Sequence, residues 1–437
     1  MPQPIARIAL TPEEAFLWDC ARRWRNPAPL PDPAALDWAR IAAVAESNRA
    51  QTLIQQVLVT AGQWDAVPEG SRKLLEEGVA GWAERAARMS EPLRSYLLAA
   101  DRAGVPTVVM KGLSVSIGVY GQPAMRPGMD ADLLVRRDQV QDCVAVLEGM
   151  GMGRWWPKLM DDRYYAQHHL HLLRCSPDFK TWFEIHWTLD HPYTLLTMDT
   201  DGLLERTTSG RLLDAPVRQM GAPDQVLSLA VHLVKHAVYL PSVMERPDLA
   251  RIILADGMLV YYLDVAEVIK LHAQELDWAL VVRLAREWGA GGILGSVLRV
   301  CREFLDAPVP EGVVEALPVR SRGINRWAMN RMADHEVAAY NNAGTSKLWD
   351  FLLMTNSTFI LRPIRLLDTL SYFVPDSDYL RRRYGAAGAG PALRHLARAT
   401  ADYARLAVNT TYYTLRRNRH MRELKRRGEL PEDLTVT

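Results

Sequence analysis

The sequence predicts an α+β fold that is mostly α. A small mixed sheet is expected between N-terminal helices and a larger C-terminal helical region. Two observations lead to this prediction. Long stretches on both sides of residues 105–190 repeat apolar side chains with the period of a helix, whereas residues 105–190 hold four short segments rich in β-branched and aromatic residues. The 437 residues are enough for two or three domains.

Four regions follow from the changes in this pattern. They are an N-terminal helical region (1–104), an α/β core (105–215), a helical domain (216–384) and a basic C-terminal helix and tail (385–437). The first helix is expected to begin after Thr11, because Thr11 can cap it and Pro12 suits its first turn. The "GAAGAG" stretch at 385–390 is expected to be a short flexible joint.

The α/β core alternates predicted strands and helices. The predicted strands are "VPTVVMKG", "DADLLV", "HHLHLLRC" and "KTWFEIHWTL", and the predicted helices are "LSVSIGVYG" and "RDQVQDCVAVLEGMG". The glycine that closes the first strand and the glycine that ends the second helix mark turns. This order predicts a compact unit with four strands.

Composition limits the class of protein. The net charge of +1 indicates that the protein as a whole does not bind polyanions, so any basic surface is local. The four cysteines are widely spaced, which favours reduced and mostly buried thiols over a disulfide framework. We find no signal peptide and no run of 18 apolar residues, and we therefore expect a cytoplasmic protein without a membrane span.

Two aspartates interrupt the predicted strand "DADLLV". Because side chains alternate along a strand, Asp130 and Asp132 should point to one side, while Ala131 and Leu133 point to a core. Two carboxylates this close repel each other, and a divalent cation such as Mg²⁺ would relieve the repulsion. Taken alone, the short motif favours a solvated strand start that carries two surface aspartates.

Other residues strengthen the metal hypothesis. Glu184 lies on a later strand and shares one face of it with His186, so a third carboxylate is available to a metal site. Gly112, which follows Lys111, would allow the backbone to approach a phosphate closely, and a helix is expected to start there. Arg126 could meet a phosphate or simply pair with one of the aspartates.

The order strand–KG–helix–DxD–helix–strand–ExH resembles the polymerase-β-type nucleotidyltransferase superfamily. More closely, it resembles a bacterial family of uncharacterised nucleotidyltransferases. The matching pieces are "VVMKGLSVSIGVYGQPAMRPGMDADLLV" and "FEIHWTL", followed by "LSLAVHLVKHAVY", "LVYYLDVAEVI", "LDWALVVRLAREWG" and "FVPDSDYLRRRYG". The resemblance reaches from about residue 35 to residue 385. It implies that the α/β core has a polymerase-β-like fold.

The resemblance also implies an activity. The enzyme would be a Mg²⁺-dependent nucleotidyltransferase, with Mn²⁺ as an alternative, that moves NMP from an NTP, with ATP expected, to a hydroxyl acceptor and releases pyrophosphate. Its catalytic and metal-binding residues would be Asp130, Asp132 and Glu184. The nucleotide-binding residues would be Lys111, Gly112, Ser114, Arg126 and His186. The superfamily usually has Gly-Ser at the phosphate turn, whereas this chain has Lys111-Gly112-Leu113-Ser114, which leaves the role of Ser114 open.

Several alternatives remain open at this point. The same fold could be a catalytically silent module that binds a nucleotide or another protein, and the histidines near Glu184 could instead hold zinc in a hydrolase. The acceptor could be a small molecule, a peptide, a protein or an RNA. The tail Arg416–Arg427 carries seven Lys and Arg residues against one acid, Glu423, and could contact nucleic acid weakly, although a solvated helix face is the simpler reading.

Overall fold

The structure, a computed structural model, describes residues 9–25, 35–126, 128, 130–154, 161–237, 240–317, 323–341 and 370–428. The N-terminal elements are α1 (Pro12–Arg23), α2 (Trp38–Ser47), α3 (Gln51–Thr60), the 3₁₀ turn η2 (Trp64–Ala66) and α4 (Glu69–Arg102). The sheet region comprises β1 (Val108–Val109), α5 (Leu113–Gly118), β2 (Ala131–Leu134), η3 (Arg137–Gln139), α6 (Val140–Gly149), α7 (Asp162–His168), β3 (His171–Cys175), β4 (Trp182–His186), α8 (Thr200–Glu205), β5 (Thr208–Leu212) and β6 (Ala215–Gln219). The remaining helices are α9 (Ala222–His236), α10 (Leu249–Ala255), α11 (Leu259–Leu271), α12 (Trp278–Trp288), α13 (Gly291–Leu305), α14 (Glu311–Ala316), α15 (Gly323–Asn341), α18 (Ser377–Tyr384) and α19 (Ala389–Arg427).

One mixed sheet lies among these helices, in the strand order β3-β4-β2-β1-β6-β5. The pairs β2/β4 and β1/β6 are parallel, and the pairs β1/β2, β3/β4 and β5/β6 are antiparallel. The predicted fold class, α+β with a small mixed sheet and mostly α, is therefore confirmed. The four predicted strands are present as β1 to β4.

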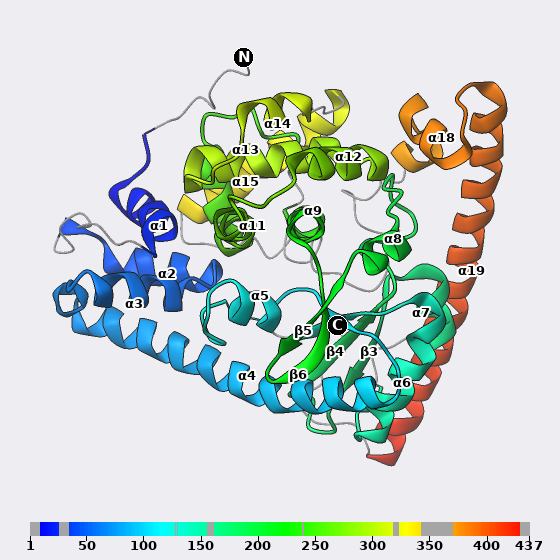
Figure 1. Ribbon diagram of the computed structural model, residues 1–437, viewed down its shortest axis with the longest axis horizontal. Helices are drawn as coiled ribbons and strands as arrows, with labels where there is room; N and C mark the ends of the chain where they lie inside the picture. The colour runs from blue at the N-terminus through cyan, green and yellow to red at the C-terminus, as the bar shows by residue number, and fades with distance from the viewer. Residues whose placement is uncertain are drawn as a thin grey trace.

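The two faces of the sheet pack against different helices. Helices α4 and α6 cover one face, where Leu133 and Ile185 of the sheet join a core with Tyr96 of α4 and Leu147 of α6. The long helix α4 runs beneath the sheet, whereas α9 and α11 lie above it (Figure 1). As predicted, Ala131 and Leu133 point into the core, which leaves the alternate positions of β2 to face the helices on the other side.

The N-terminal helices and the helices after the sheet share a second apolar core. It includes Phe16 of α1 and Ile54 of α3 together with Leu263 of α11 and Val297 of α13. Buried Asn48 ties the two groups together by donating to the backbone oxygen of Leu254 at 2.8 Å and accepting from the backbone nitrogen of Leu259 at 3.0 Å. Segments that lie far apart in the sequence thus form one helical body above the sheet.

A buried ion pair connects the loop before β2 to this helical body. Arg126 Nε lies 2.8 Å from Asp264 Oδ2 on α11, and the side chains are 5 % and 1 % exposed. Asp264 Oδ1 accepts a second hydrogen bond from Tyr120 at 3.0 Å. Ser116 Oγ accepts from the Arg126 backbone nitrogen at 2.9 Å. These contacts fix the chain four residues before Asp130.

The β5–β6 hairpin was not among the predicted strands. Its two-residue turn consists of Leu213 and Asp214, which have φ angles of +51° and +58°. Two positive φ angles are typical of the turn that suits a tight hairpin, but asparagine and glycine are the residues that usually announce it. Pro216 within β6 weakens the strand pattern further. The hairpin therefore lacks the signals by which a sequence reveals one.

Several local predictions are confirmed. Thr11 caps α1, and its side chain and that of Glu14 form a reciprocal capping box. All four cysteines are buried and free. In the tail, Glu423 Oε1 lies 3.2 Å from Arg419 Nε on the exposed surface of α19. No helix among the described residues is both long and apolar enough to cross a membrane.

Removing the carboxylate of Asp264 should destabilise the fold strongly. The Asp264→Ala variant leaves the buried Arg126 guanidinium without its carboxylate, and such a loss typically costs about 3–5 kcal/mol. Urea unfolding followed by circular dichroism measures the effect. The control is Glu287→Ala, whose ion pair with Arg283 is exposed and should contribute less than about 0.5 kcal/mol. Equal losses in the two variants would contradict a structural role for the buried pair.

Candidate metal and nucleotide site

Three carboxylates meet on the face of the sheet that the helical body covers. The parallel register of β2 and β4 pairs Asp132 with Glu184, and Asp130 stands two residues before Asp132. One oxygen from each of the three carboxylates can be chosen so that all three lie within 4.8 Å of one another. The structure thus brings together the three acids that the sequence predicted to act as one group.

The Asp132 carboxylate is completely buried, which rules out the reading of a solvated strand start. Its Oδ1 lies 2.7 Å from Lys111 Nζ and 3.0 Å from His186 Nε2. Its Oδ2 is buried and has no hydrogen-bond partner in the described part of the chain. A buried carboxylate oxygen without a partner is costly, and a divalent cation is a ligand that would satisfy it. The three carboxylates therefore fit a divalent cation.

Two histidines lie close to the carboxylate of Glu184. Its Oε2 lies 3.2 Å from His186 Nε2 and 3.4 Å from His171 Nδ1. Burial lowers the pKa of His186, but hydrogen bonds to Asp132 and Glu184 raise it, and the net direction is upward. Burial lowers the pKa of His171 well below its usual range. Hydrogen bonds thus tie His186 to both acids, whereas His171 lies against Glu184 alone.

The crowding of negative charge is strongest at Asp130. Burial, together with the nearby carboxylates of Asp132 and Glu184, raises the pKa of Asp130 to about 7, although Lys111 and His186 act in the opposite direction. Burial also lowers the pKa of Lys111, but Asp132 and the other acids outweigh it and keep the amine protonated. Without a metal, the protein therefore loses stability when Asp130 ionises.

The turn after β1 brings backbone close to the acids. Gly112 has a φ angle of +60°, and an added Cβ would lie 3.3 Å from the backbone oxygen of Asp130. Gly128 also packs closely, since a Cβ there would lie 3.2 Å from Gly112 Cα. Both the positive φ and the close approach favour glycine at position 112. Ser114 is half-buried in the first turn of α5, two residues beyond Gly112.

Comparison with protein families identifies the family of this chain. A family model described as "Uncharacterised nucleotidyltransferase" matches residues 34–306, well over half of the chain. The chain belongs to this family. The match includes every predicted site residue. Comparisons with curated proteins and with solved structures gave no match.

Among the predicted site residues of this nucleotidyltransferase family member, Arg126 has a partner that was not predicted. The sequence suggested that Arg126 would meet a phosphate or pair with Asp130 or Asp132, whereas its buried ion pair is with Asp264. The guanidinium also lies 5.2 Å from the centre of the Tyr261 ring. The sequence could not reveal this partner, because Asp264 lies 138 residues away on a helix that otherwise looks like plain core.

Lys235 at the end of α9 is a site residue that the sequence analysis missed. Lys235, Lys111 and His186 line the same narrow cavity, together with Ser228 and His232 of α9. Lys235 Nζ donates to the backbone oxygen of Leu189 at 3.1 Å. Burial lowers its pKa, with the positive charge of Lys111 acting in the same direction. In the sequence, Lys235 looks like an ordinary basic residue in the last turn of a helix.

Helix α9 also carries two histidines, His232 and His236. Their rings meet edge to face, and both rings pack against Tyr261. Of the two, His232 lines the narrow cavity beside Lys235.

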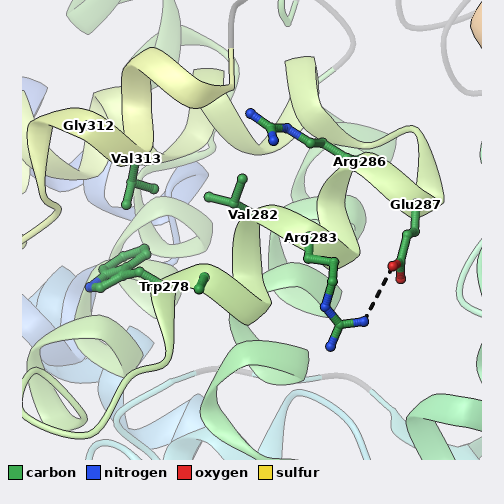
Figure 2. Close-up of a pocket in the computed structure, with 8 residues that line it drawn as sticks. Trp278, Val282, Arg283, Arg286, Glu287, Gly312 and Val313 are labelled. Carbon is green, nitrogen blue, oxygen red and sulfur yellow. Dashed lines mark hydrogen bonds and ion pairs between the residues drawn. The ribbon is translucent and has the colours of Figure 1, made fainter.

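A larger cavity of about 600 Å³ lies between α12 and α14, and no residue of the acidic cluster lines it. Trp278, Val282 and Val313 border the hollow, and Arg283 pairs with Glu287 at its side (Figure 2). Its lining lacks the convergent carboxylates that a metal needs. The acidic cluster on the sheet is therefore the better candidate for the site of chemistry.

The Asp130→Asn variant should be more stable than the wild type when metal is absent. The pKa of Asp130 is raised on folding, so its ionisation destabilises the folded state increasingly as the pH rises from about 4 through 7, and asparagine avoids this cost. At pH 8 in EDTA we expect Asp130→Asn to gain about 1–3 kcal/mol, since one pKa unit corresponds to about 1.4 kcal/mol.

The control for this prediction is the exposed Asp138, whose replacement by asparagine should change the free energy of unfolding little. Added Mn²⁺ should stabilise the wild type more than Asp130→Asn, because only the wild type keeps all three carboxylates. Urea unfolding at pH 5 and pH 8 measures both effects. A variant less stable than the wild type at pH 8 would show that Asp130 carries no such charge repulsion.

Proposed function

We propose that this protein is a Mg²⁺-dependent nucleotidyltransferase that moves NMP from an NTP, with ATP as the expected donor, to a hydroxyl acceptor. Mn²⁺ would serve in place of Mg²⁺. The observation that supports this most strongly is the cluster of Asp130, Asp132 and Glu184, in which Asp132 is fully buried and one of its carboxylate oxygens has no partner among the described residues. Membership in the nucleotidyltransferase family supports the reaction class.

In this proposal Asp130, Asp132 and Glu184 hold the cation. Bound there, Mg²⁺ would offset the negative charge of the NTP phosphates and of the attacking oxygen. The acceptor oxygen forms a bond to the α-phosphorus, the bond from that phosphorus to the bridging oxygen breaks, and pyrophosphate leaves. Glu184 is more exposed than its strand partner Asp132, and in this proposal it accepts the proton of the acceptor hydroxyl.

Cationic side chains surround the cluster from two directions. Lys111 approaches from the end of β1, and Lys235 approaches from α9 above the sheet. Both would meet the phosphates of the NTP and the departing pyrophosphate, where fixed positive charge stabilises the transition state. The backbone of Gly112 can come close to a phosphate because no side chain intervenes. Ser114 follows as a second phosphate contact.

His186 and Arg126 have supporting roles in this arrangement. His186 bonds to both Asp132 and Glu184, so it orients the carboxylates rather than meeting the nucleotide first. Arg126 holds the loop before Asp130 through Asp264. Positioning of this kind matters because a small displacement of a ligand can cost a large factor in rate.

The Asp130→Asn/Asp132→Asn double variant should lose nucleotidyl transfer. The assay incubates the protein with α-³²P-labelled NTPs, Mg²⁺ and a panel of sugars, peptides, proteins and RNA, and it measures labelled acceptor and released pyrophosphate. We expect a loss of roughly 100-fold or more, because charge stabilisation at the reacting phosphate is usually the largest contribution to the rate. Asp138→Asn is the matched control, because Asp138 is an exposed aspartate just after β2.

Full activity in the double variant would contradict the assignment of the acids. NTP binding that depends on Mg²⁺ but yields neither labelled acceptor nor pyrophosphate would instead favour the catalytically silent module. Isothermal titration calorimetry with and without Mg²⁺ separates these two outcomes.

A further inference from the structure

We propose that His171, Glu184 and His186 form a second metal site, which prefers a transition-metal ion such as Co²⁺ or Zn²⁺ over Mg²⁺. This site adjoins the acidic cluster and shares Glu184 with it. The inference goes beyond nucleotidyl transfer and does not require it, since it depends on the donor atoms of two strands alone.

The register of the sheet brings the three donors together. Strands β3 and β4 are antiparallel, and His171 stands directly opposite His186. Glu184 lies two residues before His186, so both side chains leave β4 on the same face. Rings of His171 and His186 approach to 4.9 Å between centroids. Three potential ligands thus share one small area of one sheet face.

The spacing of the donor atoms suits a metal. Glu184 Oε2 lies 3.4 Å from His171 Nδ1 and 3.2 Å from His186 Nε2. With metal–nitrogen and metal–oxygen bonds of about 2.0–2.1 Å, ligand atoms of a tetrahedral site lie about 3.3 Å apart. One donor atom from each of the three residues lies within 4.8 Å of the others.

A buried nitrogen atom without a hydrogen bond also indicates a ligand. His171 Nδ1 is buried and makes no hydrogen bond within the described residues, although it lies near Glu184. Leaving a buried polar atom unpaired typically costs about 1–3 kcal/mol, and a metal ion between His171 and Glu184 would remove this cost. The ring centroids of His169 and His171 lie 5.1 Å apart, and those of His169 and His191 lie 4.8 Å apart. Imidazole rings therefore border this side of the site.

The donor set determines which ion each site prefers. Asp130, Asp132 and Glu184 offer oxygen alone, which suits Mg²⁺. His171 and His186 add imidazole nitrogen, which Zn²⁺, Co²⁺ and other transition metals bind well and Mg²⁺ binds poorly. The two neighbouring sites are therefore distinguishable by metal type, even though they share one carboxylate.

The test titrates Co²⁺ into the metal-free full-length protein in the presence of excess Mg²⁺, which competes for the all-oxygen site. We expect one tightly bound Co²⁺ per chain, with intense visible absorption bands of a low-coordinate site that contains nitrogen. His171→Ala should weaken Co²⁺ binding by roughly tenfold or more. Asp130→Asn should retain it, and so should His420→Ala, which removes an exposed histidine on α19.

Two results would overturn the proposal. One is wild-type protein that takes up no Co²⁺ under these conditions, and the other is Co²⁺ binding that His171→Ala leaves unchanged while Asp130→Asn abolishes it. Pulsed EPR of bound Cu²⁺ in the wild type, again with excess Mg²⁺, checks the site without any variant, because directly bound imidazole gives a ¹⁴N coupling. The absence of this coupling would also refute the site. If the wild type transfers NMP but binds no Co²⁺, this second metal site is refuted and the proposed function stands. If it binds Co²⁺ through His171 but transfers no NMP, the proposed function fails and the second site stands.

Discussion

The burial of Asp132 is the constraint on which the rest of the site depends. A carboxylate cannot lie in a protein interior without positive charge and hydrogen bonds around it. Lys111 supplies the charge at 2.7 Å, and His186 supplies a bond at 3.0 Å, but one oxygen still lacks a partner. Because Glu184 is held beside Asp132 by the parallel register, the protein concentrates negative charge that its own cations only partly offset.

The two faces of the sheet differ in the side chains that they carry. Toward α4 and α6, residues such as Leu133 and Ile185 pack in an apolar core. The alternate positions carry the acids and histidines, together with apolar Leu134. Helices α9 and α11 lie on that side of the sheet (Figure 1). The Arg126–Asp264 pair fixes the loop before β2 to the helical body. Both faces thus contribute to an apolar core, but the cluster of acids and histidines lies on one face alone.

The sequence revealed those parts of the site that follow from local periodicity. Asp130 and Asp132 were expected on one side of a strand, and Glu184 on one face with His186, because strands alternate their side chains. The contacts between distant segments could not be predicted in this way. Lys235 follows Asp132 by 103 residues on an ordinary-looking helix, and nothing local marks Asp264 as the partner of Arg126. The β5–β6 hairpin escaped notice because Leu213 and Asp214 occupy a turn that glycine usually marks.

The central claim is that three carboxylates on the sheet hold the cation that binds the nucleotide. A crystal structure of the protein with Mn²⁺ and a non-hydrolysable ATP analogue tests it most directly, because the anomalous signal of manganese locates the ion. The account predicts an anomalous peak in contact with Asp130, Asp132 and Glu184, with phosphate oxygens completing its coordination and Lys111 close by. A nucleotide bound elsewhere in the protein, with no manganese at these carboxylates, would contradict it.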